Sequence, residues 1–288
     1  MSRPVPGRVR QSLLQAAALC VAAAYVLPLL FVVTTALAPS GQALGTITPS
    51  GFKPANFSDA LHSAAFGTMF VNSAIVTLGS TAVQVVLACM AGYALARIAF
   101  RGREGFFLLL IAVLVIPPEV TLVPLFVLVK HLPLEGGNDI LGQGGIGLLN
   151  TLPGLMFPHL VSALSIFLMR QFYIGMPEEL ADAARIDGAT EWTVLWRIFT
   201  PLAWPAVVTV AIFAFQGAWN DFLWPLVMTK SPDVQTVQLG LTVFFQENTT
   251  QWSLLMAAVI LISVPVVVMF LLGQRTFQEG VATGAVKE

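Results

Sequence analysis

The chain has 288 residues, of which 57 % are hydrophobic and 10 % are charged, and its formal net charge is −1. A composition this apolar excludes a soluble globular domain and indicates a membrane protein. A near-neutral chain without a long block of like charge also offers no basic surface for nucleic acid. Cys20 and Cys89 both fall inside apolar segments, so we expect small buried side chains without a disulfide framework or a metal site.

Long apolar windows in the sequence predict where the chain crosses a membrane. The first apolar run is too long for a signal peptide and lacks a small-x-small cleavage site, so we expect a retained helix. A helix that spans a bilayer needs about 20 apolar residues. Windows with at most one charge then predict six spans: Leu13–Leu37, Thr68–Ala96, Phe106–Val129, Thr151–Met169, Pro201–Met228 and Trp252–Leu272. Prolines in the third and fifth spans predict kinks around a central cavity, although proline also occurs in spans for packing reasons: Pro117, Pro118, Pro124, Pro201, Pro205 and Pro225.

The basic residues predict the orientation of these spans. Cytoplasmic loops carry an excess of Lys and Arg. One face holds eleven of them: Arg3, Arg8, Arg10, Arg97, Arg101, Arg103, Arg170, Arg185, Arg197, Arg275 and Lys287. The other face holds three: Lys53, Lys130 and Lys230. This bias places both termini, and the loop between the fourth and fifth spans, in the cytoplasm.

That loop contains a charged stretch, Glu178 to Pro205, which reads EELADAARIDGATEWTVLWRIFTPLAWP. Pro177 and the two glutamates after it predict the start of a short helix, because proline suits the first turn and carboxylates favour the positive end of the helix dipole. Four residues at spacings of three and four predict one face made largely of small side chains: Leu180, Ala183, Ala184 and Asp187. Gly188 is placed to end the helix in a left-handed conformation.

A second helix follows the glycine. Thr190 can cap it, and its apolar residues lead into the membrane at Pro201. We therefore expect two helices joined by a glycine turn at the membrane surface. A small-residue face lets the backbone of another protein approach, and the flanking carboxylates can pair with arginines of that protein. The pattern predicts a docking surface, with an ordinary interfacial amphipathic helix as the alternative.

These residues resemble a known motif, the cytoplasmic Glu-Ala-Ala loop of permease subunits in binding-protein-dependent ABC importers. The run DAARIDGA matches it in register with the residues downstream: Asp182, Ala183, Ala184, Gly188, Ile198 and Pro201. Asp182 stands where the family usually has Glu, and Thr200 where it usually has Leu. The resemblance implies that eight residues couple the chain to an ATPase: Glu179, Asp182, Ala183, Ala184, Asp187, Gly188, Ile198 and Pro201.

Other stretches extend the resemblance over roughly residues 10–288. Segments such as IPPEVTLVPLF (116–126), NTLPGLMFPHL (150–160) and WNDFLWPLV (219–227) are similar to the sugar-importer branch, and specifically to the second permease of maltose-type and glycerol-3-phosphate-type systems. The resemblance implies an all-α membrane protein with six transmembrane helices, the type I ABC importer permease fold and a cytoplasmic coupling helix. In those terms the chain divides into an N-terminus (1–12), a first helix with its outer loop (13–67), the type-1 transmembrane domain (68–272, with the coupling loop at 171–200) and a C-terminal tail (273–288).

The resemblance also implies partners. They are a sister permease in a heterodimer, two ABC ATPase subunits and an extracytoplasmic solute-binding protein, in the plasma membrane of a bacterium or archaeon. ATP and Mg would bind to the ATPase subunits, with no cofactor in this chain. The sequence agrees, because it contains no GxxxxGK[ST] run.

Ionisable residues at membrane depth are costly and are candidates for function. Glu119 lies beside a double proline in the third span, and Asp221 lies near the outer end of the fifth. Asp221 belongs to a cluster of amides, a carboxylate and indoles that suits the hydroxyls and ring faces of a sugar: Gln216, Trp219, Asn220, Asp221 and Trp224. His159 in the fourth span completes the candidates for the substrate pathway.

Each candidate has a structural alternative. Asn220 and Asp221 could cap a helix end while Trp219 and Trp224 belong to the aromatic belt at the interface. Glu119 could satisfy backbone groups near a proline break, and a lone histidine in a span is more often packed and hydrogen-bonded than a ligand.

Two other function classes remain open from the residues alone. An ion-coupled secondary transporter of a small polar solute would show inverted repeats and carboxylates near the midplane, and one glutamate beside a double proline is thin support. An intramembrane enzyme would need motifs such as GxSxG or HExxH, and neither occurs.

Overall fold

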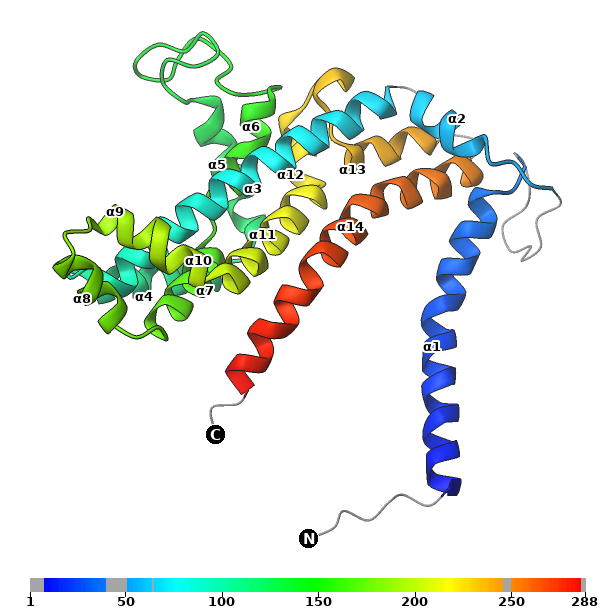
Figure 1. Ribbon diagram of the computed structural model, residues 1–288. Coiled ribbons are helices and arrows are strands. Elements are labelled where there is room, and N and C mark those ends of the chain that lie inside the picture. The colour runs from blue at the N-terminus through cyan, green and yellow to red at the C-terminus, as the bar shows by residue number, and fades with distance from the viewer. Residues whose placement is uncertain (1–7, 40–50, 64, 246–249, 286–288) are drawn as a thin grey trace. The chain divides into compact units, whose positions relative to one another are not determined.

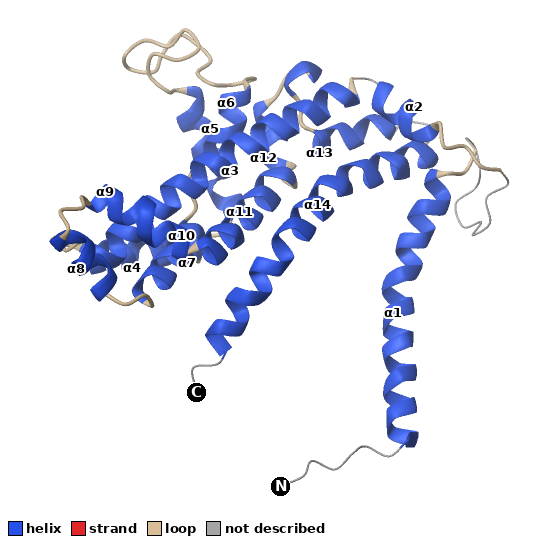
Figure 2. Cartoon of the chain, viewed as in Figure 1, coloured by secondary structure: helices blue, strands red, loops and turns tan. Residues whose placement is uncertain are grey.

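The computed structural model describes residues 8–39, 51–63, 65–245 and 250–285 (Figure 1). Within these ranges the regular structure is helical, apart from one isolated bridge between Phe245 and Thr250 (Figure 2). The predicted all-α class is therefore confirmed. The part of the outer loop at 40–50 lies outside the described residues.

The chain divides into two units, which are described separately. The first comprises residues 1–66 and 241–263. Its elements are α1 (Arg8–Ala36), α2 (Asn56–His62), η4 (Leu241–Phe244) and the first part of α14 (Trp252–Ala285). The buried Asn56 side chain donates to the carbonyls of Ala36 and Ala38, each at 2.8 Å. This pairing satisfies carbonyl groups that the end of α1 leaves without a helical partner.

The expectation that both cysteines are buried is wrong for Cys20, which lies on α1. Its side chain is exposed. The apolar window of α1 is 0 % buried by protein. Burial of this thiol would therefore have to come from lipid, because the rest of its unit does not cover the helix.

The second unit comprises residues 67–240 and 264–288 and carries the features that bear on function. Its long and bent helices are α3 (Phe66–Arg97), α4 (Arg103–Leu114), α5 (Pro118–Lys130), α6 (Leu152–Met156), η1 (Phe157–His159), α7 (Ala163–Ile174) and α11 (Trp204–Trp219). Its shorter elements are α8 (Glu179–Ile186), α9 (Glu191–Thr193), the π-helix η2 (Val194–Phe199), α10 (Thr200–Leu202), α12 (Leu223–Met228), η3 (Pro232–Val234) and α13 (Val237–Gly240). Figure 1 shows α8 and α9 at the same end of this unit as α4 and α7.

Three described helices are long and apolar enough to cross a membrane without a break: Gln11–Ala36, Phe66–Arg97 and Trp252–Gln274. Three bent helix pairs raise the number to six if each pair forms one span. The bends are 107° between α4 and α5, 46° between η1 and α7, and 84° between α10 and α11. The kinks predicted for the third and fifth spans are confirmed, and the fourth span is bent as well.

Proline explains the sharpest bend. Pro117 and Pro118 follow α4, and neither has the N–H that would continue its hydrogen-bond ladder. The chain turns at Pro117, whose extended backbone (ψ 134°) precedes the first residue of α5. A window of apolar residues does not detect this break, so the predicted single span Phe106–Val129 consists of two helices.

The core of the second unit lies where α3, α7, η2 and α11 meet. Tyr93, Tyr173 and Phe199 form three edge-to-face ring pairs there, with centroids 5.4 to 6.0 Å apart. Gly92 lets α3 approach α7, because a Cβ at this position would lie 2.6 Å from the Cβ of Met169. Close packing at this crossing holds the long continuous helix against the bent ones.

Substitution of Gly92 tests this packing. We expect Gly92→Val to push α3 away from α7 and to lower the free energy of unfolding by about 1–3 kcal/mol, the usual cost of an overpacked core. The matched control is Gly105→Val on α4, where an added Cβ meets nothing within 4 Å. Thermal unfolding of the purified protein in detergent, followed by tryptophan fluorescence, compares the two. Equal thermal unfolding midpoints for the two variants would contradict the close approach of α3 and α7 at Gly92.

Candidate functional site

The coupling loop forms the two short helices that its sequence predicts. α8 ends before Gly188, which has a φ of 82°, in the left-handed region that favours glycine. The N–H of Gly188 donates to the carbonyl of Arg185 at 3.0 Å, and the N–H of Ala189 donates to that of Ala184 at 2.9 Å. The Thr190 hydroxyl accepts from the N–H of Thr193 at 3.3 Å and caps the second helix. The glycine turn and the threonine cap are both confirmed.

The exposed face of α8 differs from the predicted one. Ala184 is only 9 % exposed and Ala181 is fully buried, because α8 packs this face against η2. Ala183 lies on the opposite side with Asp182, and both are exposed. The prediction that Ala184 belongs to the free face is therefore wrong. The face open to a partner carries carboxylates and the side chain of Ile186, which is 86 % exposed.

The other residues of the motif take different positions. Glu179 and Asp187 are exposed at the two ends of α8. Ile198 is half-buried in η2 and packs against the buried cluster. Pro201 is exposed in α10, where the chain enters the 84° bend. Ile198 and Pro201 thus shape the second helix and do not belong to the surface of α8.

An arginine links the two short helices. Arg185 donates from Nε to Glu191 Oε1 and from Nη1 to Asp182 Oδ1, each at 2.8 Å. The hydroxyl of Tyr93, on the buried side of α3, donates to Glu191 Oε2 at 2.5 Å. The hydrogen bond from Arg185 lowers the pKa of the Glu191 carboxyl, and the hydrogen bond to Glu191 raises the pKa of Arg185. This network ties the coupling loop to a membrane-spanning helix.

Sequence reasoning missed this network. Arg185 sits inside the matched motif, but Tyr93 is 98 residues away from Glu191 along the chain. The available signal was a tyrosine near the C-terminal end of an apolar helix together with a glutamate directly after the predicted cap Thr190. Neither residue type identifies its partner until the helices are packed.

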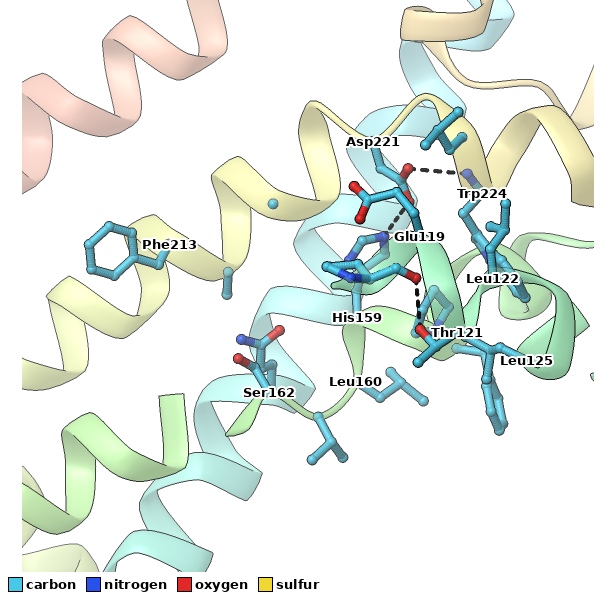
Figure 3. Close-up of a pocket in the computed structure, with 18 residues that line it drawn as sticks. Glu119, Thr121, Leu122, Leu125, His159, Leu160, Ser162, Phe213, Asp221 and Trp224 are labelled. Carbon is cyan, nitrogen blue, oxygen red and sulfur yellow. Dashed lines mark hydrogen bonds and ion pairs between the residues drawn. The ribbon is translucent and has the colours of Figure 1, made fainter. Parts of the chain in front are cut away.

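The second feature is a cavity of about 760 Å³ lined by parts of α3, α5, α11, α12 and the segment from η1 to α7 (Figure 3). We call it the helix-break cavity. Four predicted residues of the substrate pathway line it: Glu119, His159, Asp221 and Trp224. Its remaining lining is mostly apolar and includes Phe157 and Phe213.

Three helix interruptions converge on this cavity. Glu119 lies in the first turn of α5, after the 107° bend. His159 ends η1, before the 46° bend into α7. Asp221 occupies the gap between α11 and α12. Each ionisable side chain of the cavity therefore comes from the point where a helix starts or stops.

A direct contact joins two of these interruptions. His159 Nε2 lies 2.9 Å from Asp221 Oδ2, and both side chains are largely buried. Asp221 Oδ1 accepts from the backbone N–H of Trp224 at 3.2 Å, so this carboxylate also caps the start of α12. The Trp224 indole donates to the Gly154 carbonyl at 3.0 Å and is buried. Asp221 thus has the capping role of the structural alternative and a place in the cavity lining at once.

The other predicted pathway residues lie elsewhere. Gln216 lines a separate apolar groove of about 270 Å³ between α11 and α14. Trp219 is 2 % exposed and stacks on Phe215 with ring centroids 5.7 Å apart, so it belongs to the core and to neither the cavity nor an aromatic belt. Asn220 Oδ1 accepts from Gln238 Nε2 at 3.2 Å, so this side chain pairs with one beyond α12. The predicted cluster is therefore divided, because α11 points its successive side chains in different directions.

Comparison with known proteins decides the family. Residues 84–281 match the family described as the binding-protein-dependent transport system inner membrane component. The chain belongs to this family. It is 36 % identical over 222 residues to the arabinooligosaccharides transport system permease protein AraQ of Halalkalibacterium halodurans, covering 77 % of this chain and 75 % of the relative. It is 32 % identical over 271 residues to the melibiose/raffinose/stachyose import permease protein MelC of Bacillus subtilis, covering 93 % of each.

Solved structures agree on the fold. The chain resembles a bacterial ABC transporter involved in the import of the acidic polysaccharide alginate, with a TM-score of 0.80 at 21 % identity, covering 96 % of this chain and 100 % of that one. This inner membrane component is a multi-pass permease subunit of a transport system and not an enzyme. Its family favours the importer over the secondary transporter. Among the described residues, no group of three or more His, Cys, Asp or Glu side chains is placed to hold a metal ion.

The network at Arg185 generates a prediction for the coupling loop. We expect Glu191→Gln to weaken the hydrogen bonds from Arg185 and Tyr93, because it removes the charge that both donors face. Hydrogen exchange of the backbone amides in α8 should then accelerate about tenfold in protein held in lipid nanodiscs. The control is Glu179→Gln, which changes an exposed carboxylate at the start of the same helix, outside the network. If the backbone amides of α8 exchanged at the same rate in both variants, the network around Arg185 would not be what holds α8 in place.

Proposed function

We propose that this inner membrane component is one permease of an ATP-driven importer for a carbohydrate or a sugar-like solute. It forms half of the translocation pathway and takes up the motion of an ATPase through residues 178–201. The observation that carries the proposal is the coupling loop, whose exposed α8 face is anchored to α3 by Arg185, Glu191 and Tyr93. The relatives named above as permeases for oligosaccharides support the class of cargo.

Membership of the family supports a set of proposed partners. The complex would contain a sister permease, two ABC ATPase subunits that bind ATP and Mg, and an extracytoplasmic solute-binding protein. Both termini and the coupling loop would face the cytoplasm of a bacterium or archaeon, as the distribution of Lys and Arg predicts. No step of ATP hydrolysis would take place in this chain.

The long helix α3 offers a route for coupling. Tyr93 holds the coupling loop, and Gln84 on the same helix lines the helix-break cavity. Nine residues of α-helix separate them, a distance of about 14 Å along the axis. Gln84 also donates to Ser165 on α7 at 2.8 Å. A displacement of the loop by an ATPase would therefore move a rigid element that reaches the cavity, as alternating access requires.

A docking experiment tests the coupling role. Ile186→Asp should abolish co-purification of the ATPase subunit in mild detergent, because it places a charge on the exposed apolar tip of α8 without touching the core. The matched control is Ile140→Asp, at a position of similar exposure (77 %) in the loop between α5 and α6. That variant should retain the ATPase. An ATPase that remains bound to the Ile186→Asp variant at the wild-type level would remove the docking assignment.

A transport experiment tests the class of transporter. The complete complex in proteoliposomes should accumulate solute only when its solute-binding protein and ATP are both supplied. Solute uptake by this chain alone, driven by an ion gradient, would replace the importer with a secondary transporter.

A further inference from the structure

The charge of the helix-break cavity bears on its cargo. Two of its lining residues carry carboxylates, Glu119 and Asp221, and His159 is the one basic side chain among the described residues that line it. Neither Lys nor Arg is in that lining. Acidic side chains therefore outnumber basic ones in this lining by two to one.

The helix ends at this cavity do not offset that charge for a solute. The N–H of Trp224 at the start of α12 is already bonded to Asp221 Oδ1. The N–H of Ser165 in the first turn of α7 contacts the Ser162 hydroxyl at 3.4 Å. At the start of α5, Pro118 has no N–H, and the N–H of Val120 donates to the Pro117 carbonyl at 3.1 Å. These three donors are used within the chain, which leaves fewer N–H groups at the helix ends for an external anion.

The remaining polar groups are mainly acceptors. Glu119 makes no hydrogen bond or ion pair within the part of the chain that the structure describes. Gln84 uses its amide nitrogen on Ser165, and the Thr121 hydroxyl donates to the Pro118 carbonyl at 2.8 Å, so each keeps a free oxygen. Sugar hydroxyls can donate to such oxygens, while Phe157, Phe213 and other apolar residues offer surface to the faces of a sugar ring.

The size of the cavity makes the charge effective. A cavity of about 760 Å³ keeps a bound solute close to its lining side chains, within about the Debye length of roughly 8 Å at physiological ionic strength. Carboxylates of the lining would therefore repel an anionic solute held there.

We propose that the helix-break cavity is the cargo subsite of this chain, and that its unbalanced carboxylates select a neutral polyhydroxylated sugar and exclude an anionic one. The inference rests on the proposed importer function and narrows its substrate class. It also distinguishes this chain from its structural neighbour, which is involved in importing an acidic polysaccharide although the two share a fold.

A charge-selective thiol probe measures the field in the cavity directly. Gly217 lines the cavity, and a Cβ added there meets nothing within 4 Å, so Gly217→Cys introduces a thiol without a clash. The two native thiols are removed by Cys20→Ala and Cys89→Ala. Purified complex in detergent is then treated with a cationic methanethiosulfonate reagent (trimethylammonium) or an anionic one (sulfonate). The ratio of the two reaction rates reports the local potential and needs neither ATP nor transport.

The matched control is Gly105→Cys in the same background, because that position is equally open but lies outside the cavity. We expect the cationic-to-anionic rate ratio at position 217 to exceed that at position 105 about tenfold, as expected for a cleft lined by one sign of charge. Glu119→Gln should reduce the ratio at 217, and Glu119→Lys should reverse the preference. Equal rate ratios at the two positions would overturn the proposal. So would a rate ratio at position 217 that stays the same when Glu119 is substituted.

An uptake experiment completes the test. The complete complex in ATP-loaded proteoliposomes is given raffinose as the neutral probe and digalacturonate as the anionic probe. Uptake of raffinose without uptake of digalacturonate supports the proposal, whereas comparable uptake of digalacturonate overturns it and leaves the importer function intact. If neither probe is taken up, the ratio of the cationic to the anionic reaction rate at position 217 decides whether the proposal holds. Failure of the importer function itself would instead appear as loss of the ATPase partner and of all ATP-driven uptake.

Discussion

The need to satisfy every backbone polar group inside a membrane governs this structure. A helix can stop within a bilayer only where its free N–H and carbonyl groups find partners or face a cavity. Three helix interruptions at the cavity meet this condition with local devices: Ser162 caps α7, Asp221 caps α12, and Pro118 opens α5 without an N–H to satisfy. The cavity lies where these interruptions converge. Its ionisable residues, Glu119, His159 and Asp221, stand at the helix ends that border it.

The same arrangement connects the cavity with the loop at residues 178–201. α3 is continuous over 32 residues and touches both regions, through Gln84 at the cavity and Tyr93 at the coupling loop. The bent helices pack on it through the close contact at Gly92 and the aromatic group around Tyr173. In such an arrangement, a displacement at one end of a continuous helix can change the packing at the other end.

The coupling loop shows how far local sequence patterns reach. The turn at Gly188 and the cap at Thr190 were predictable, because each depends on the conformation or hydrogen bonding of a few neighbouring residues. The orientation of α8 was not, since spacing alone cannot say which of two alanine-bearing faces meets the protein. Packing against η2 buries Ala181 and Ala184, and leaves Ala183 and Ile186 free.

Composition and apolar windows by themselves determined that the chain is a helical membrane protein, with up to six spans and a charged loop between the fourth and fifth. They also selected Glu119, His159 and Asp221 as costly residues at membrane depth. Only the tertiary structure paired His159 with Asp221 across 62 residues, and placed Gln216 and Trp219 outside the lining of the helix-break cavity. Such contacts depend on the angle of each break and the rotation of each helix, which are set by packing between distant segments and leave no periodic trace in the sequence.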